Sequence, residues 1–184
     1  MEEDWNDTFY DLFREAVGRY HEGHRNVDGF FTDQEIMFLS SIGCRRRELF
    51  DFVESYARTG APSPTTVLLI AAARRDFFLI IQHGQFYQGK PVIGYDLPGF
   101  GDELSGLPYL PRLIAKARAK LAGSMGDDII YCCENDRRFF RDHGHIHPAD
   151  FLRVVWAAGD SDPKIYDYVR QCSLSSAAKH VEEE

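Results

Sequence analysis

The sequence predicts an all-α protein, a compact bundle of about eight short helices. Apolar residues recur three or four positions apart in several segments, which is the spacing of one helix face. These segments begin at residues typical of helix N-caps and end at glycines. With 44% apolar and 27% charged residues among 184, the composition is typical of a soluble globular domain rather than of a disordered chain.

The first two helices are predicted in an N-terminal lobe, residues 1–84. The first helix runs from about Trp5 to Tyr20, because aromatic and aliphatic residues follow one face over this stretch. The second helix has a complete start signal. Thr32 and Glu35 have the spacing of a capping box, in which each side chain accepts a hydrogen bond from the backbone of the other.

The third and fourth helices complete this lobe. The third ends near Gly60. The fourth begins at Ser63, an N-cap residue followed by a proline, and includes the longest apolar segment of the chain, VLLIAAARRDFFLIIQ. We expect Gly84 to end it.

The C-terminal half repeats the same signals after a connector rich in glycine and proline, residues 85–107, which can hold a small hairpin. The C-terminal lobe covers residues 108–172, and residues 173–184 are predicted to be a frayed tail. Four helices are expected in this lobe, beginning at Pro108 with Pro111, at Asn135 or Asp136, at Pro148, and at Asp162 with Pro163. Lys116 lies toward the end of the first of these, where the helix dipole favours a cation.

Charge and cysteine content limit the partners and the compartment. The formal net charge of −8 argues against nucleic acid and membrane surfaces, because both require a positively charged face. The acidic start MEEDWNDTF differs from a signal peptide, and the cysteines lack the spacing of a zinc site or a disulfide framework. We therefore expect a cytoplasmic protein with reduced thiols.

Arg74 is the most informative charged residue. It lies in the middle of the apolar stripe of the fourth helix, with Arg75 on one flank. A buried arginine retains its proton and so requires a carboxylate, carbonyl groups or a bound anion. An internal ion pair and a guanidinium site for a carboxylate or phosphate ligand are both consistent with this position.

A second group of charges follows Cys132 and Cys133. Asp136, Arg137 and Arg138 stand at the start of a short helix, where backbone N–H groups and the helix dipole favour an anion. The simpler interpretation is a solvated helix start with Asp136 as its N-cap.

The histidines suggest a metal site as a further hypothesis. They form a pair near the end of the first helix and an alternating set in a turn: His21 and His24, and His143, His145 and His147. Neither group matches a known metal signature, and glycines beside them indicate that they lie where helices end. Helix-end roles, such as capping by His147 before a proline, are the alternative.

Three short motifs of the C-terminal half occur together in a known family: Pro111, Arg112 and Lys116; Asp136, Arg138 and Phe139; and Phe151 with Leu152. By these motifs, roughly residues 95 to 172 resemble a bacterial family described as domain of unknown function 5069. The resemblance implies an all-helical, cytoplasmic, bacterial protein, and it implies neither an activity nor a cofactor.

The function predicted from the residues is a helical pocket that binds a small anionic metabolite, a carboxylate or a phosphate, through arginines. The candidate ligand-binding residues are Arg74, Arg75, Arg112, Asp136, Arg137, Arg138 and Asp150. In an enzyme, Asp150 or a nearby histidine would serve as acid or base, and Cys132 or Cys133 as nucleophile. The alternatives are a protein-interaction or homodimerisation module, with aromatic surfaces as the contact, and a metal-dependent helical enzyme that uses the histidines.

Overall fold

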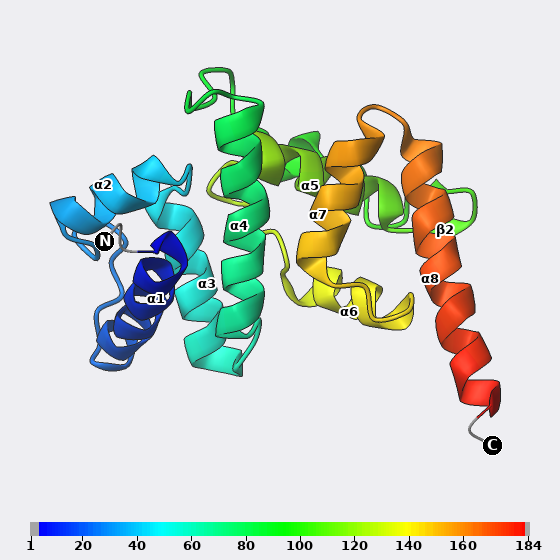
Figure 1. The fold of residues 1–184 in the computed structure, drawn as a ribbon, viewed down its shortest axis with the longest axis horizontal. Helices are drawn as coiled ribbons and strands as arrows, with labels where there is room; N and C mark the ends of the chain where they lie inside the picture. Colours follow the sequence, from blue (N-terminus) through cyan, green and yellow to red (C-terminus); the bar gives the residue numbers. More distant parts are fainter. Residues whose placement is uncertain (1–3, 183–184) are drawn as a thin grey trace. The chain divides into compact units, whose positions relative to one another are not determined.

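The computed structural model describes residues 4–182 and confirms an all-α fold, with eight α-helices in this range and one two-stranded sheet (Figure 1). The chain forms two compact units, Met1–Tyr87 and Gln88–Glu184. Within residues 4–182, no helix combines the length and the apolar character that crossing a bilayer requires.

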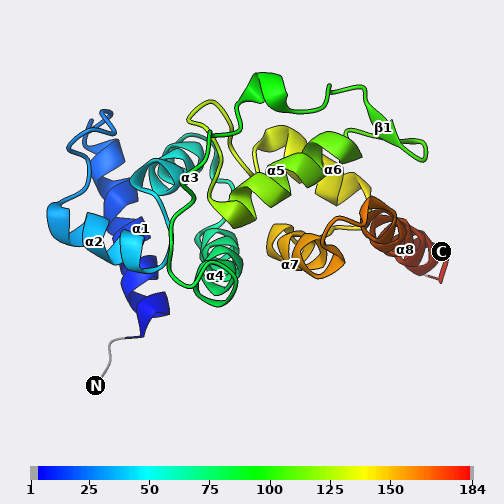
Figure 2. The same ribbon diagram turned by 90° about the horizontal axis from the view of Figure 1, so that it is seen from above.

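The first unit consists of four helices that share one core. Their bounds are α1 (Trp5–His21), α2 (Asp33–Ser41), α3 (Arg46–Thr59) and α4 (Pro64–Ile80). Helix α1 packs against both α3 and α4 (Figure 2). The apolar faces predicted from the spacing are buried here, including the side chains of Phe9, Phe13, Leu49, Val53, Val67 and Ile70.

The predicted helix boundaries in this unit are mostly confirmed. The Thr32–Glu35 capping box is present, and the Ser63 hydroxyl accepts a hydrogen bond from the backbone of Thr66 at 3.2 Å. Gly60 ends α3 in the left-handed conformation. Helix α4 ends at Ile80, four residues before the predicted Gly84, because the chain turns there and the Gly84 N–H bonds back to Phe78 O at 2.9 Å.

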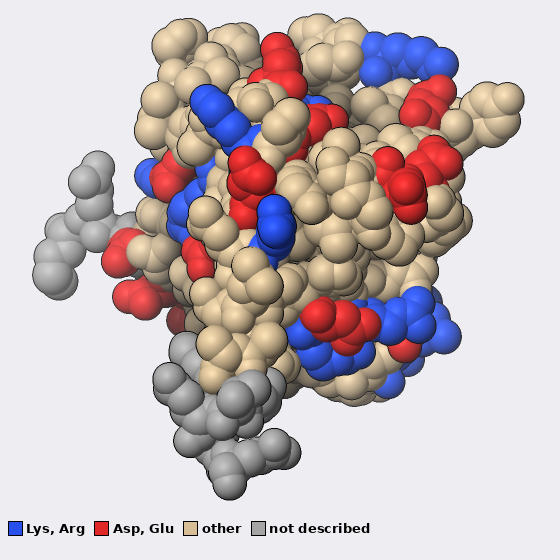
Figure 3. Space-filling view, turned by 90° about the vertical axis from the view of Figure 1, so that its right-hand side faces the viewer, with Lys and Arg blue, Asp and Glu red and all other residues tan. Residues whose placement is uncertain are grey.

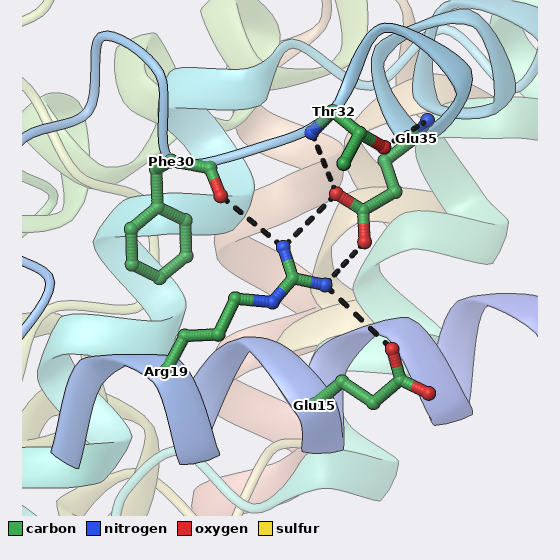
Figure 4. A network of polar contacts seen from close by, with 5 residues as sticks. All are labelled: Glu15, Arg19, Phe30, Thr32 and Glu35. Atoms are coloured by element: carbon green, nitrogen blue, oxygen red, sulfur yellow. Dashed lines mark hydrogen bonds and ion pairs between the residues drawn. The ribbon is translucent and has the colours of Figure 1, made fainter. Parts of the chain in front are cut away.

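One polar network joins α1 to the start of α2 (Figure 4). The Arg19 guanidinium forms a two-pronged ion pair with the Glu35 carboxylate and also donates to Phe30 O at 3.1 Å. Glu35 additionally accepts from the backbone N–H of Thr32 at 2.8 Å. Glu35, the acidic residue of the α2 capping box, therefore also holds α1 in place.

The second unit is built around α7, which packs against α5 and α8. Its elements are the 3-10 turn η1 (Gly94–Asp96), β1 (Glu103–Leu104), β2 (Leu107–Pro108), α5 (Leu110–Ala122), α6 (Glu134–Asp142), α7 (Pro148–Ala158) and α8 (Asp162–Glu182). The strands form the small hairpin that the connector was expected to hold, with Glu103 opposite Pro108.

Three details of this unit differ from the sequence interpretation. Helix α5 begins at Leu110 rather than at Pro108, because Pro108 belongs to strand β2. Helix α6 begins at Glu134 rather than at Asn135 or Asp136, with Cys133 as its N-cap. Asp136 is therefore the third residue of the helix, and its carboxylate accepts the Cys133 N–H at 3.2 Å. Residues 173–182 continue α8 as helix, and residues 183–184 of the predicted tail lie outside the described residues.

The charge distribution can be followed on one face of the molecule. On the face shown in Figure 3, Lys and Arg side chains are interspersed with Asp and Glu, and no continuous basic area covers the described residues there. A nucleic-acid interface typically presents basic side chains gathered on one face, so this view lacks that pattern.

Candidate functional site

The candidate site is a pocket of about 270 Å³ in the second unit. It lies where the connector, the start of α5 and the length of α6 meet. Its lining combines three aromatic rings with polar and charged side chains: Phe100, Tyr109 and Phe139 with Asn135, Arg138, Asp142 and His143. Such a combination of apolar walls and a few polar groups is typical of small-molecule sites.

A buried polar network supports one wall of this pocket. The Tyr109 hydroxyl donates to Asp136 Oδ1 at 2.6 Å, and Lys116 Nζ donates to Asp136 Oδ2 at 2.5 Å. Lys116 Nζ also lies 3.3 Å from the sulfur of Cys133. Lys116 and Asp136 are 4% and 0% exposed, so the charges are satisfied by each other and by these neighbours rather than by water.

The local backbone explains how Tyr109 reaches this network. Tyr109 is the N-cap of α5 and has a φ of +73°, a left-handed conformation that costs energy in a residue with a side chain. Its N–H donates to Asp102 O at 2.9 Å, which ties it to the hairpin. The turn thus places the Tyr109 ring between the pocket and Asp136.

Two groups in and beside this network, Tyr109 and Cys132, have raised pKa values. Burial raises the pKa of Tyr109 far above its usual value, and the Asp136 carboxylate raises it further, so the hydroxyl remains a hydrogen-bond donor. Burial likewise raises the pKa of Cys132 to about 12, with Asp136 acting in the same direction. Cys132 is therefore a neutral thiol at pH 7, which argues against its predicted role as nucleophile.

Arg112 supports the pocket residue Phe100 from outside the lining. Its guanidinium lies 4.3 Å from the centre of the Phe100 ring and donates to Pro98 O at 2.7 Å. The Phe100 ring stacks on Tyr109, with 5.9 Å between the ring centres. Arg112 therefore holds the connector against α5 and does not itself line the pocket.

The structure separates the other charged residues predicted for a site in this unit. Arg138 lines the pocket, where it donates to Asn135 Oδ1 at 2.7 Å. Arg137 instead donates to Cys132 O at 2.8 Å. Asp150 lies on α7, 3.5 Å from Arg153, with 61% of its side chain exposed, and it is not part of the pocket lining.

Arg74 and Arg75 belong to the first unit. Arg74 is 1% exposed and donates to Gln82 Oε1 at 2.6 Å, and within the part of the chain that the structure describes it forms no ion pair. Arg75 lies over the Trp5 ring, 4.9 Å from its centre, and 3.8 Å from the carboxylate of Asp76. The internal ion pair considered for Arg74 is thus absent among the described residues.

The histidines take the positions of helix ends. His147 caps α7, since its Nδ1 accepts the Ala149 N–H at 3.2 Å, as the sequence predicted. His143 ends α6 and stacks on Phe139, with 4.0 Å between the ring centres. Among residues 4–182, no group of three or more His, Cys, Asp or Glu side chains has an arrangement suited to a metal ion.

Sequence reasoning missed Tyr109 and Phe100 as pocket residues and assigned Lys116 to the helix dipole. The structure pairs Lys116 with Asp136. A signal for this pair was available, because Lys116 lies on the apolar side of α5, between Leu113 and Ala117, and a buried lysine requires a carboxylate.

The comparisons with known proteins identify one family. A family model described as Domain of unknown function (DUF5069) matches residues 100–183, a segment that contains every residue lining the pocket. Neither the curated proteins nor the solved structures gave a match. The C-terminal part of the chain, residues 100–183, is therefore similar to this family, as its motifs predicted.

Proposed function

We propose that the second unit binds a small organic anion with a flat apolar part, in the pocket between α5 and α6. The observation that carries this proposal is the position of Arg138. Arg138 lines a pocket together with three aromatic residues, Phe100, Tyr109 and Phe139. A flat ring fits between aromatic walls, and a carboxylate or phosphate group on it fits the fork of an arginine.

The remaining polar groups set further requirements for the ligand. His143 Nδ1 lies 2.8 Å from Phe139 O, which can only accept, so Nδ1 is the donor of this bond and Nε2 is the ring nitrogen left for a ligand. The Asp142 carboxylate is an acceptor. A ligand that carries a hydroxyl or amine group besides its anionic group would satisfy both kinds of partner.

The buried network gives the pocket a fixed shape. The Tyr109 hydroxyl is held by Asp136, and Asp136 is held by Lys116. Because these groups are committed to each other, the network supports a binding role, in which Tyr109 is a rigid wall, over a role in proton transfer.

The test uses 4-fluorobenzoate as probe, with fluorine NMR as the measurement. We expect the anion to bind at least tenfold more tightly than 4-fluorobenzamide, its uncharged isostere, because only the anion makes a charge-assisted hydrogen bond. The R138Q variant should lose this preference. R153Q is the matched control, since Arg153 is a half-exposed arginine on α7 outside the pocket.

Equal binding of 4-fluorobenzoate to wild type and R138Q would contradict the proposal. In that case the alternative of a protein-interaction or homodimerisation module gains weight. Light scattering coupled to gel filtration then measures whether the chain forms a dimer.

A further inference from the structure

Arg74 has an unusual environment for a buried cation. Its side chain is 1% exposed, and Nη1 is the only guanidinium nitrogen with a hydrogen-bond partner in the described residues, the Gln82 amide oxygen. Nε and Nη2 are buried and have none. The pKa of Arg74 is lowered by burial, and the charge of Glu48 offsets only part of this effect. A buried polar group left in this state costs free energy, so an occupant for this edge is expected.

The two unpartnered nitrogens form one side of the guanidinium. Their N–H bonds point in parallel, at the spacing of two oxygens of a carboxylate or a phosphate. A single acceptor, such as the amide that holds Nη1, cannot satisfy both in this way. The chemistry of the free edge therefore favours an oxoanion.

The segment before α3 contacts the Phe78 ring, which in turn lies close to Arg74. The Arg74 guanidinium lies 5.2 Å from the centre of the Phe78 ring. That ring in turn fills the space of a missing side chain at Gly43, where a Cβ would be 2.5 Å from Phe78 Cγ. Gly43 lies three residues before the first residue of α3, so the ring bridges Arg74 to the helix start.

The start of α3 carries charges of both signs. Its first N–H groups have no acceptor within the helix, and the N-cap residue is Arg45, whose side chain has no acceptor to cap them. Arg45 and Glu48 both lie within electrostatic range of Arg74. The Glu48 carboxylate accepts the Arg45 N–H at 3.4 Å, and it is the one acidic group of this helix start that opposes an anion.

We propose that the Nε–Nη2 edge of Arg74 binds a small oxoanion through two of its oxygens. This site is made by residues of the first unit and is separate in its residues from the pocket of the proposed function. Its ligand is an inorganic oxoanion or the carboxylate of a small acid. The experiment distinguishes these two ligands by comparing phosphate and sulfate with formate.

The experiment measures thermal unfolding and phosphorus NMR of the full chain in a Tris chloride buffer. Phosphate, sulfate and formate are added at the ionic strength of a chloride control. We expect at least one oxoanion to raise the melting temperature as the logarithm of its concentration, with no rise in chloride. A rise with phosphate and sulfate indicates an inorganic oxoanion, and a rise with formate alone indicates a carboxylate.

Substitutions of single arginines show which of them binds the oxoanion. R74K keeps the charge but lacks the fork, and it should bind the stabilising oxoanion at least tenfold more weakly than wild type. R75K, a change at the neighbouring arginine, and R153Q, at the half-exposed arginine on α7, should bind it as wild type does. R74M removes the charge as well as the fork. If this variant fails to fold, R74K and the titration of wild type still decide the question.

Two outcomes overturn the proposal. The first is an equal melting temperature in oxoanions and in chloride, which would mean that water alone satisfies this edge of Arg74. The second is full retention of the oxoanion effect in R74K. Loss of the effect in R138Q with retention in R74K would assign it to the pocket instead.

Discussion

Lys116 and Asp136 form an ion pair from which water is almost fully excluded. Nζ and Oδ2 are 2.5 Å apart, and the two side chains are 5% and 0% exposed. The carboxylate also accepts from the Tyr109 hydroxyl and from the backbone N–H of Cys133. One aspartate thus joins α5, the start of α6 and the wall of the pocket.

The D136N substitution should destabilise the protein by about 3–5 kcal/mol, because it leaves the Lys116 ammonium buried without a counter-charge. The free energy of unfolding in urea, followed by circular dichroism, measures this loss. The double variant K116M/D136L should recover most of it, since no unpaired charge remains. Equal losses in the single and double variants would show that the pair is not the cause.

A second prediction concerns acid stability and the Arg19–Glu35 pair. Burial alone would raise the pKa of Glu35, but the hydrogen bonds from Arg19 and from the Thr32 backbone outweigh it and lower the pKa below its usual 4.5. A carboxylate with a lowered pKa adds stability above its unfolded pKa, and this stability is lost as pH falls through the folded value.

Wild type should therefore melt at a higher temperature than E35Q at pH 7, and the gap should close as pH falls below about 4. Thermal melts across this pH range provide the measurement. E15Q is the control: Glu15 also faces Arg19, at 3.6 Å, but 70% of its side chain is exposed, so this change should have little effect at any pH. A difference in melting temperature between wild type and E35Q that stays constant with pH would show that ionisation of Glu35 does not stabilise the fold.

A third prediction compares two glycines with the same backbone conformation. Gly43 and Gly60 have φ values of +69° and +72°. A Cβ at Gly43 would overlap the Phe78 ring, whereas a Cβ at Gly60 would meet nothing within 4 Å. G60A should cost about 1 kcal/mol for strain alone, and G43A should cost more, because the ring must also move. Unfolding in urea tests the difference, and equal costs would mean that Phe78 moves freely.

The end of α8 gives a fourth prediction. Leu174 is 61% exposed, whereas the backbone of Cys172 and Ser173 just before it lies close to Gly144. Deleting residues 174–184 should leave the melting temperature unchanged to within about 1 °C, since Leu174 buries little apolar surface. A drop of several degrees would show that this segment is docked.

The helices and their starts could be predicted because the signals are local. The Thr32–Glu35 box and the Ser63 cap each depend on residues three apart, and the structure contains both. The start of α6 was predicted one or two residues too late, and the reason is also physical. Asp136 resembles an N-cap by type, but its carboxylate is needed by Lys116, twenty residues earlier, and the helix begins before it.

The candidate site depends on contacts between residues far apart in the sequence, which local patterns do not predict. The burial of Arg74 follows from the apolar stripe around it, yet the stripe does not say whether a carboxylate lies opposite. Tyr109 joins the pocket through a left-handed turn that its residue type does not favour. Phe100 lies in a connector without periodicity, so only the folded chain brings it to the pocket.

The pairing of Val92 with the start of the loop after α5 determines where the second unit can be cut from the chain. The Val92 N–H donates to Ser124 O at 2.8 Å, the Gly126 N–H donates to Val92 O at 2.7 Å, and the Gly94 N–H donates to Asp128 Oδ2 at 2.8 Å. All three bonds use residues before Phe100, where the family match begins. A fragment that starts at Phe100 would expose a backbone edge that the full chain covers, so an excised domain should start at residue 88 instead.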